Sequence, residues 1–135
     1  AGAKYITITT RHHDGFSLFK TATSTYNSVD GSPFKRDIIK ELADACKRHD
    51  IKLHLYYSHL DWGREDYPVG RTGTGTGRPK EKADWPSYYK FMNTQLTELL
   101  TNYGKVGAIW FDGWWDHDSD VKPFDWQLGA VCFDS

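Results

Sequence analysis

Two amphipathic helical segments separate three strand-like segments along this chain, and that alternation constrains the fold more than any other feature. The strand-like segments are residues 4–10, 51–58 and 106–111, which are rich in β-branched and aromatic residues. The order strand-helix-strand-helix-strand predicts an α/β fold with a parallel sheet and right-handed crossovers, and residues 4–10 should form a buried strand. This pattern fits both a doubly wound sheet and a segment of a (β/α)8 barrel.

The two helices have recognisable ends and buried faces. We predict a first helix over residues 35–49, introduced by Ser32 and Pro33, because proline is tolerated in a first turn. Asp50 follows it, at a position where a glycine would be expected. The second helix has Asp84 as its N-cap and ends at Gly104. Apolar residues at the helical period predict two buried faces: Ile38, Ile39, Leu42, Ala45 and Cys46 in the first helix, and Tyr88, Met92, Leu96, Leu99 and Tyr103 in the second.

Composition excludes several classes of partner. The 17 basic and 18 acidic residues give a net charge of −1, so the chain lacks the basic surface of a nucleic-acid-binding protein. No apolar run approaches the roughly 18 residues of a membrane span, so no membrane partner is expected. Cys46 and Cys132 fit no metal-binding spacing, so both are expected to be buried free thiols.

Residues 62–82, between the second strand and the second helix, are expected to form a long loop. It contains the glycine-rich run TGTGTG at residues 72–77. That run lacks the closing Lys-Ser/Thr of a phosphate-binding loop, so a flexible loop is the favoured interpretation.

Polar loops follow all three strands and hold most of the ionisable and aromatic residues. In parallel α/β folds, ligand sites gather at the carboxyl ends of the strands. Three clusters should meet there: residues 11–16 (RHHDGF), 54–62 (HLYYSHLDW) and 110–114 (WFDGW). Paired histidines can donate hydrogen bonds to hydroxyls, and aromatic rings offer flat apolar faces. This combination suits a sugar ring, with one carboxylate available as base, ligand or nucleophile.

Each cluster also has an explanation that needs no ligand. The triplet HHD at residues 12–14 could close a strand, with its side chains satisfied locally, or form half of a metal site, although adjacent extended histidines point to opposite faces. His54 fits a strand histidine. Strand residues alternate between faces, so one of Tyr56 and Tyr57 should belong to the core. Three acidic residues that lack the glycine and closing glutamate of a calcium loop should lie in a solvated loop: Asp116, Asp118 and Asp120.

Asp112 is the residue that a structural role explains least well. It lies among three tryptophans and a phenylalanine in IWFDGWWD, residues 109–116, and an unpaired buried carboxylate is costly. The third strand delivers it to the rim, with Trp110 on the same side. Gly113 allows a sharp turn and the close approach of a ligand. A carboxylate beside an indole at a strand end is suited to attack on the anomeric carbon of a sugar.

The segments TRHHDGFSLF, LHLYYSHLDW and GAIWFDGWWD, in this order and spacing, resemble the α-L-fucosidases of glycoside hydrolase family 29, and the bacterial branch in particular. The resemblance extends from Ala1 to about Leu128. It implies a (β/α)8-like (TIM-type) barrel, of which this chain would supply about three strands and two helices. We therefore expect residues 1–135 to be a partial catalytic barrel domain, with earlier and later strands missing.

The resemblance also implies an activity and a set of site residues. Such an enzyme is a retaining exo-glycosidase that hydrolyses terminal α-L-fucosyl residues through a covalent fucosyl-aspartate intermediate. The W-x-D motif of the family maps onto Trp110, a substrate contact, and Asp112, the nucleophile. Its paired histidines, which bind fucose hydroxyls, map onto His12 and His13, and its strand tyrosine maps onto Tyr56. No metal or organic cofactor is implied, and the expected partner is a fucosylated oligosaccharide or glycoconjugate.

Parts of the family pattern are expected outside this chain. The general acid/base, which must lie about 5–5.5 Å from the nucleophile in a retaining enzyme, should follow residue 135, and further fucose contacts should precede Ala1. The nearby Glu65 and Asp66 match nothing in the family. A catalytically incomplete fucose-binding fragment is therefore the alternative to an enzyme, and a metal-dependent hydrolase is a third interpretation. The resemblance implies a secreted or periplasmic setting.

Overall fold

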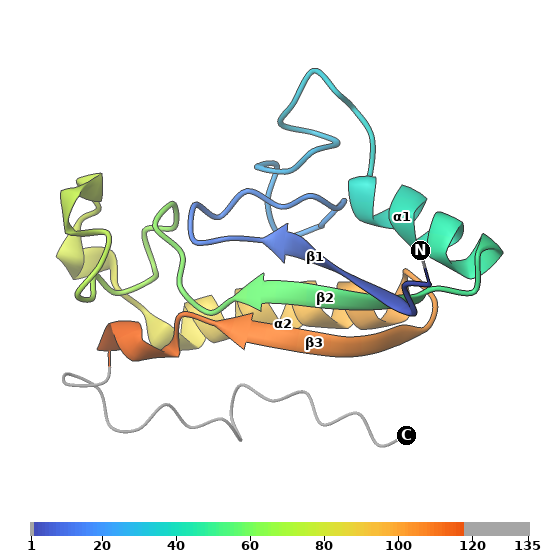
Figure 1. The fold of residues 1–135 in the computed structure, drawn as a ribbon. Helices are drawn as coiled ribbons and strands as arrows, with labels where there is room; N and C mark the ends of the chain where they lie inside the picture. The colour runs from blue at the N-terminus through green and yellow to red at the C-terminus, as the bar shows by residue number, and fades with distance from the viewer. Residues whose placement is uncertain (1, 118–135) are drawn as a thin grey trace.

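The computed structural model describes residues 2–117, which form a three-stranded parallel sheet with two α-helices (Figure 1). The strands are β1 (Tyr5–Arg11), β2 (Lys52–Ser58) and β3 (Val106–Asp112), in the order β1-β2-β3. The helices α1 (Ile38–Arg48) and α2 (Trp85–Thr101) connect consecutive strands. Short 3₁₀ turns are η1 (Thr74–Thr76), η2 (Lys80–Lys82) and η3 (Trp114–His117). The predicted alternation of elements is confirmed.

One face of the sheet packs against both helices and forms the core. The register places Ile8, Leu55 and Ile109 side by side, so alternate residues of each strand point to this face. Ile39 of α1 and Met92 of α2 are completely buried in the same core. Figure 1 shows α2 running behind β2 and β3. The carboxyl ends of the three strands are therefore fixed by a continuous core beneath them.

The opposite face of the sheet is open in the described part of the chain. Trp110 is 68% exposed there, and Tyr5 stacks on His54 with ring centroids 4.6 Å apart. The expectation that residues 4–10 form a buried strand is wrong for its first half. Tyr5 and Ile6 are exposed because, within residues 2–117, β1 lies at the edge of the sheet and pairs with β2 on one side. In a closed (β/α)8 barrel this open face would be the interior, which side chains fill.

Helix α1 begins at Ile38, so the predicted start at residue 35 after Ser32 and Pro33 is wrong. Lys35 has a φ of 55°, a left-handed conformation that no α-helix contains. The N-cap is Asp37, whose side chain accepts a hydrogen bond from the Lys40 N–H at 2.9 Å. Ser32 instead belongs to the preceding turn, where its hydroxyl donates to the main-chain oxygen of Ser28 at 2.8 Å. The predicted apolar face is buried at Ile39 and Cys46 and half-buried at its other members, Ile38, Leu42 and Ala45.

The remaining helix signals are confirmed, apart from the position at which α2 ends. Asp50 has a φ of 52°, so a non-glycine residue does occupy the left-handed position after α1. Asp84 caps α2 by accepting a hydrogen bond from the Ser87 N–H at 3.2 Å. Gly104 has the expected left-handed conformation, with a φ of 76°, but α2 itself ends at Thr101, three residues before the predicted end. All five residues of the predicted buried face are buried: Tyr88, Met92, Leu96, Leu99 and Tyr103.

The loop before α2 has local structure of its own. η1 lies within the glycine-rich run, between Gly73 and Gly77, which both adopt left-handed conformations with φ of 70° and 71°. Cys46 is a buried free thiol, as expected, whereas Cys132 lies outside the described residues. Within residues 2–117, neither helix combines the length and the apolar character that a membrane span requires.

Candidate active site

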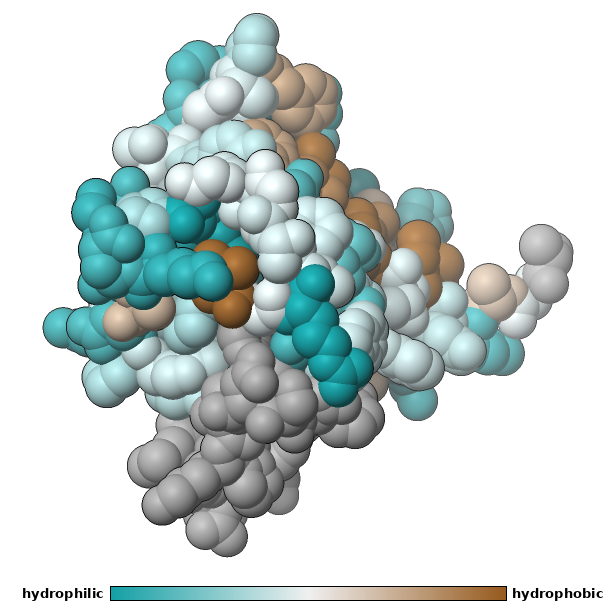
Figure 2. Space-filling model, turned by 90° about the vertical axis from the view of Figure 1, so that its left-hand side faces the viewer, coloured by the Kyte–Doolittle hydropathy of each residue, from teal (hydrophilic) through white to brown (hydrophobic). Residues whose placement is uncertain are grey.

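The carboxyl ends of the strands bring the three sequence clusters to one rim. β1 ends beside His12 and His13, and β3 ends at Asp112. The register of β2 and β3 pairs Ser58 with Asp112, so the end of β2 lies directly beside the end of β3. Figure 2 looks onto this end of the sheet, where hydrophilic residues cover most of the described surface and a small hydrophobic patch lies among them.

Asp112 is held by hydrogen bonds on both carboxylate oxygens. Oδ1 accepts from the main-chain N–H of Gly113 at 2.9 Å, and Oδ2 accepts from the phenol of Tyr56. The main-chain oxygen of Asp112 accepts from the N–H of His59 at 2.7 Å, which ties β3 to the segment after β2. The Asp112 side chain keeps 24% of its surface exposed. The carboxylate is therefore fixed on one side and open to a ligand on the other.

Gly113 makes this arrangement possible. Its φ of 92° lies in a region that other residues rarely adopt. A Cβ atom at this position would also lie 2.6 Å from Cδ2 of Leu60. The sharp turn expected after Asp112 is therefore confirmed, and it depends on the absence of a side chain.

Tyr56 is a permanent hydrogen-bond donor to Asp112. Burial of the phenol, its hydrogen bond to the carboxylate and the negative charge of Asp112 together raise the pKa of Tyr56 well above its ordinary value. The neighbouring Tyr57 points to the opposite face, where it is completely buried and donates to Oε1 of Gln95 at 2.8 Å. The structure thus places Tyr56 at the rim and Tyr57 in the core.

The two histidines occupy different positions beside Asp112. The ring of His12 stacks on Tyr56, with centroids 5.4 Å apart and planes within 9°. His13 turns its Nε2 towards Oδ2 of Asp112 at 3.9 Å and its Nδ1 towards Oγ of Ser58 at 2.7 Å. Burial, and then the proximity of His12, lower the pKa of His13 below its ordinary value, so its imidazole is neutral at neutral pH.

Aromatic side chains border this cluster. Trp62 packs edge-on against His13 with ring centroids 5.3 Å apart, and its main-chain N–H donates to the carbonyl of His13 at 2.7 Å. Trp115 approaches the same ring at 6.4 Å. Trp110 lies on the face of Asp112 but two residues earlier on β3, about 6–7 Å along the strand. His12, His13, Tyr56 and Asp112 thus converge, and Trp110 stands apart from them on the open face.

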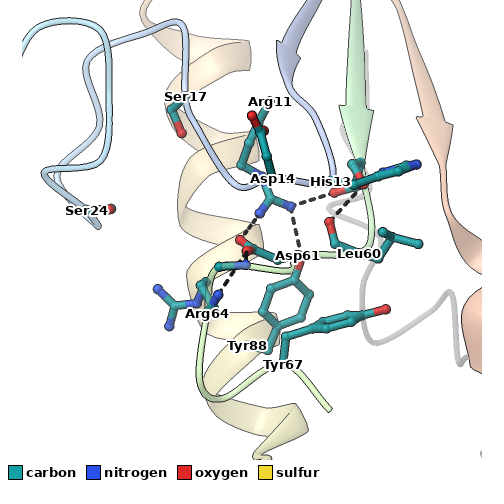
Figure 3. Close-up of polar contacts among 12 residues, drawn as sticks. Arg11, His13, Asp14, Ser17, Ser24, Leu60, Asp61, Arg64, Tyr67 and Tyr88 are labelled. Carbon is teal, nitrogen blue, oxygen red and sulfur yellow. Dashed lines mark hydrogen bonds and ion pairs between the residues drawn. The ribbon is translucent and has the colours of Figure 1, made fainter. Parts of the chain in front are cut away.

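A buried ion pair between two residues of the sequence motifs, which the motifs alone do not reveal, lies at the ends of the strands (Figure 3). The Arg11 guanidinium contacts the Asp61 carboxylate, and both side chains are almost completely buried. Arg11 also donates to the Ser58 carbonyl at 2.6 Å and to the Tyr88 hydroxyl at 2.9 Å. Asp61 accepts from the main-chain N–H of Gly63 at 2.7 Å. The ends of β1, β2 and the following loop are therefore joined through two charges.

Asp116 contradicts its predicted place in a solvated loop. Its side chain is completely buried and accepts hydrogen bonds from the N–H and the hydroxyl of Thr72, each at 2.7 Å, and from the Tyr67 hydroxyl at 3.1 Å. These partners precede it by more than forty residues, so no local pattern reveals them. Asp118 and Asp120 lie outside the described residues.

Three side chains at the rim carry atoms that can bind a metal ion. His12, His13 and Asp112 offer ligand atoms within 4.8 Å of one another. In the structure, Nδ1 of His13 contacts Ser58 and Oδ2 of Asp112 accepts from Tyr56. Both side chains therefore already have hydrogen-bond partners in the protein. Such an arrangement suits the binding of ligand hydroxyl groups as well as the binding of a cation.

Comparisons with known proteins give one consistent result. Residues 1–132 match the family described as Alpha-L-fucosidase, slightly past the Leu128 at which the resemblance was expected to end. The plasma alpha-L-fucosidase of Homo sapiens is 33% identical over 148 residues, covering 98% of this chain and 31% of that protein. The alpha-L-fucosidase AlfC from Lactobacillus casei, in complex with alpha-L-fucose product, is 32% identical with a TM-score of 0.72, covering 81% of this chain and 38% of that one.

The structural neighbours also settle the fold class. An alpha-L-fucosidase from Vibrio sp. strain EJY3 is 34% identical with a TM-score of 0.75, covering 81% of this chain and 19% of its own. The catalytic domain of these fucosidases is a TIM-type barrel, so the expectation of three strands and two helices of such a barrel is confirmed. This chain spans about a third or less of the length of the curated relatives that it matches.

Proposed function

The chain belongs to the alpha-L-fucosidase family, and from that premise we propose that it supplies the nucleophile and the fucose-binding side of a retaining exo-α-L-fucosidase site. The proposed substrate is a terminal α-L-fucosyl residue of an oligosaccharide or glycoconjugate. The similarity to a structure in complex with the fucose product supports this choice of sugar. The observation that carries the proposal is the convergence of Tyr56, His13 and Asp112 at the ends of three adjacent strands.

The proposed reaction has two displacements at the anomeric carbon. In the first, a carboxylate oxygen of Asp112 attacks this carbon, and the bond to the leaving oxygen breaks as that oxygen takes a proton from a general acid. In the second, water displaces Asp112 from the covalent fucosyl-enzyme and gives its proton to the same group. Hydrogen bonds from Tyr56 and Gly113 keep Asp112 in position, so little reorganisation accompanies the attack.

We assign the general acid/base to a group outside residues 2–117. A suitable residue must be a carboxylic acid free to exchange its proton. Asp61 is committed to its ion pair with Arg11, and Asp116 is committed to Thr72. Early in the loop after β2, Asp66 forms an ion pair with Arg64, and Glu65 forms one with Lys82.

Sugar binding is assigned to the histidines and the exposed aromatic rings. His12 and His13 lie within reach of hydroxyls on a ring placed over Asp112, and the indole of Trp110 offers an apolar face 68% exposed. Trp62 borders His13 on the side of the glycine-rich loop, where it donates to the Thr72 hydroxyl at 3.1 Å. That side is our proposed place for the group to which fucose is attached.

The test is covalent labelling of the full chain with 2-fluoro-fucosyl fluoride, followed by intact mass and peptide mapping. Fluoride leaves without protonation, so labelling depends on the nucleophile and not on the general acid. We expect one fucosyl adduct, on Asp112, in a sample that circular dichroism shows to be folded. Asp112→Asn should abolish the adduct, whereas Asp14→Asn, which alters an exposed rim carboxylate, should leave it unchanged.

The same experiment separates the alternatives. A folded chain that binds fucose and forms no adduct would indicate a sugar-binding fragment without catalysis. The ion pairs of Asp61, Asp66 and Glu65 favour this alternative, because they engage carboxylates that could otherwise serve as the general acid. An adduct on a different carboxylate would overturn the role of Asp112. Loss of labelling on addition of a chelator would support a metal-dependent hydrolase.

A further inference from the structure

Ser58 lies at the end of β2 with its hydroxyl between two partners. Its Oγ is 2.7 Å from Nδ1 of His13 and 2.8 Å from the main-chain oxygen of Leu60. Ser58 is completely buried, and Leu60 is only 1% exposed. The imidazole of His13, the hydroxyl of Ser58 and the carbonyl of Leu60 therefore bond to one another without competition from bulk water.

The chemistry of these groups fixes the direction of both bonds. A serine hydroxyl has one hydrogen to donate, and a carbonyl oxygen can only accept. Within residues 2–117, the Leu60 oxygen accepts from the Ser58 hydroxyl, so the hydrogen of this hydroxyl points to that carbonyl. The reverse arrangement would leave a buried carbonyl without its donor, which is costly. The hydroxyl oxygen must then accept from His13, and Nδ1 of His13 must carry a proton.

This bond determines what His13 presents to the site. A neutral imidazole has one N–H and one lone pair, and the hydrogen bond at one nitrogen fixes the state of the other. We propose that Ser58 is a positioning residue that holds neutral His13 in its Nδ1–H form, so that Nε2 accepts a hydrogen bond from a ligand hydroxyl placed beside Asp112. The inference rests on the proposed fucose site, and it replaces the expected donor role of His13 by an acceptor role.

The distance from His13 to Asp112 supports this assignment independently. Nε2 lies 3.9 Å from Oδ2 of Asp112, beyond the range of an N–H···O hydrogen bond. Oδ2 already accepts from Tyr56, so an N–H on Nε2 would add a second donor and favour a closer approach. Two acceptors that face each other leave room for a group that carries its own hydrogen. A sugar hydroxyl supplies one, whereas a fluorine or a hydrogen in its place does not.

His12 provides an internal contrast. Its ring stacks on Tyr56 and is exposed, so the contacts of this histidine do not impose one tautomer in the same way. Of the two histidines, His13 is the one whose Nε2 lone pair is fixed by a hydrogen bond at Nδ1. The site should therefore require a hydroxyl as donor at one position of the sugar ring and tolerate its replacement better at the others.

The first test reads the tautomer directly and needs no substrate. Two-bond ¹H–¹⁵N correlation spectra of the full chain, with ¹⁵N-labelled histidine at neutral pH, identify which ring nitrogen carries the proton, and His13→Gln assigns the signal. We expect the Nδ1–H form in the native protein. Ser58→Ala should shift His13 towards the Nε2–H form, which an imidazole in water prefers. Ser17→Ala, a change at another completely buried serine, should leave the tautomer unchanged.

The second test reads the consequence for the ligand. Affinities of the native protein for fucose and its monofluoro and monodeoxy analogues should show one position at which both replacements weaken binding at least tenfold. Ser58→Ala should reduce that ratio, and Ser58→Thr, which keeps the hydroxyl, should restore it.

An Nε2–H signal for His13 in the native protein would overturn the inference even if Asp112 is labelled. An Nδ1–H signal with tenfold discrimination but no adduct on Asp112 would support the inference and contradict the hydrolytic function. If Ser58→Ala does not fold, the native spectrum decides alone.

Discussion

The phenol of Tyr56 donates a hydrogen bond to Oδ2 of Asp112, across two adjacent strands whose register pairs Ser58 with Asp112. The two side chains lie fifty-six residues apart in the sequence and meet because both strands run in the same direction. Burial and the neighbouring carboxylate raise the pKa of Tyr56 above its ordinary value, so the phenol keeps its proton and donates it to this hydrogen bond. The proposed nucleophile is therefore oriented by a rigid strand and not by a loop.

Replacing Tyr56 by phenylalanine should slow catalysis without unfolding the protein. A hydrogen bond to a charged group contributes about 1.5–3 kcal/mol, so we expect kcat on an aryl fucoside to fall by roughly 10- to 100-fold. The matched control is Tyr57→Phe, which removes a phenol from the core, where it donates to Gln95. That change should cost about 1 kcal/mol of stability and leave kcat nearly unchanged. Equal effects of the two variants on kcat would contradict the role of Tyr56.

Replacing Asp112 by glycine should remove turnover and preserve sugar binding. The variant lacks the attacking oxygen but keeps His12 and His13, so kcat should fall more than about a thousandfold while the Kd of fucose changes little. Sodium azide, a small anion that fits the vacated space, should restore turnover of an aryl fucoside and yield a fucosyl azide. A loss of turnover smaller than about tenfold would show that another residue is the nucleophile.

The element order and the location of the site follow from local sequence patterns. Strand alternation predicts that one of Tyr56 and Tyr57 belongs to the core, while the choice of Tyr56 as the site residue depends on the family resemblance. The parallel order places three polar clusters at the same rim. Gly113 and Asp50 are recognisable because their backbone conformations depend on the residue itself and its neighbours. Information of this kind lies within a few residues, so it can be read from the chain directly.

The partners that hold the rim in place could not be predicted in the same way. Arg11 meets Asp61 across fifty residues, and Asp116 meets Thr72 across forty-four. Both acidic side chains look like solvent-exposed loop residues until the fold brings their donors to them. The start of α1 was missed for a related reason. Asp37 is favoured as the cap because it also accepts from the N–H of Lys20 and the hydroxyl of Tyr103.

Breaking the buried ion pair should destabilise the protein far more than breaking an exposed one. Arg11→Met leaves the Asp61 carboxylate buried without its cation, and such losses cost about 3–5 kcal/mol. Lys40→Met breaks the exposed pair with Asp44 and should lower the stability far less, because water screens the attraction between the two charges. Urea denaturation of the full chain measures both values. Similar midpoints for the two variants would show that the buried pair adds little to stability.

Stability should decrease as the pH falls from 6.5 to about 4, partly because of His59. Burial, and then the positive charge of Arg11, lower the pKa of His59 to about 4, although Asp112 acts in the opposite direction. Between pH 6.5 and about pH 4, His59 binds a proton in the unfolded chain but not in the folded chain. Protonation therefore stabilises the unfolded state, and the free energy of unfolding falls by up to about 3 kcal/mol. His59→Phe should keep the packing against Phe111 and flatten this part of the pH profile. Parallel profiles of the native protein and the variant would refute the assignment.

Removing the carboxylate of Asp116 should loosen the loop that borders the proposed site. In Asp116→Ala the N–H and hydroxyl of the half-buried Thr72 lose their acceptor, so two hydrogen bonds between this loop and η3 are removed. Thr72 in turn accepts from the indole of Trp62, so the position of Trp62 beside His13 depends on the same carboxylate. We expect faster tryptic cleavage between residues 71 and 82.

The variant should also show a KM that rises more for fucosyl disaccharides than for fucosyl fluoride, since only the former extend towards Trp62. Asp14→Ala, at an exposed rim position, is the control. Unchanged cleavage together with equal KM changes for both substrates would mean that Asp116 supports the loop without shaping the site.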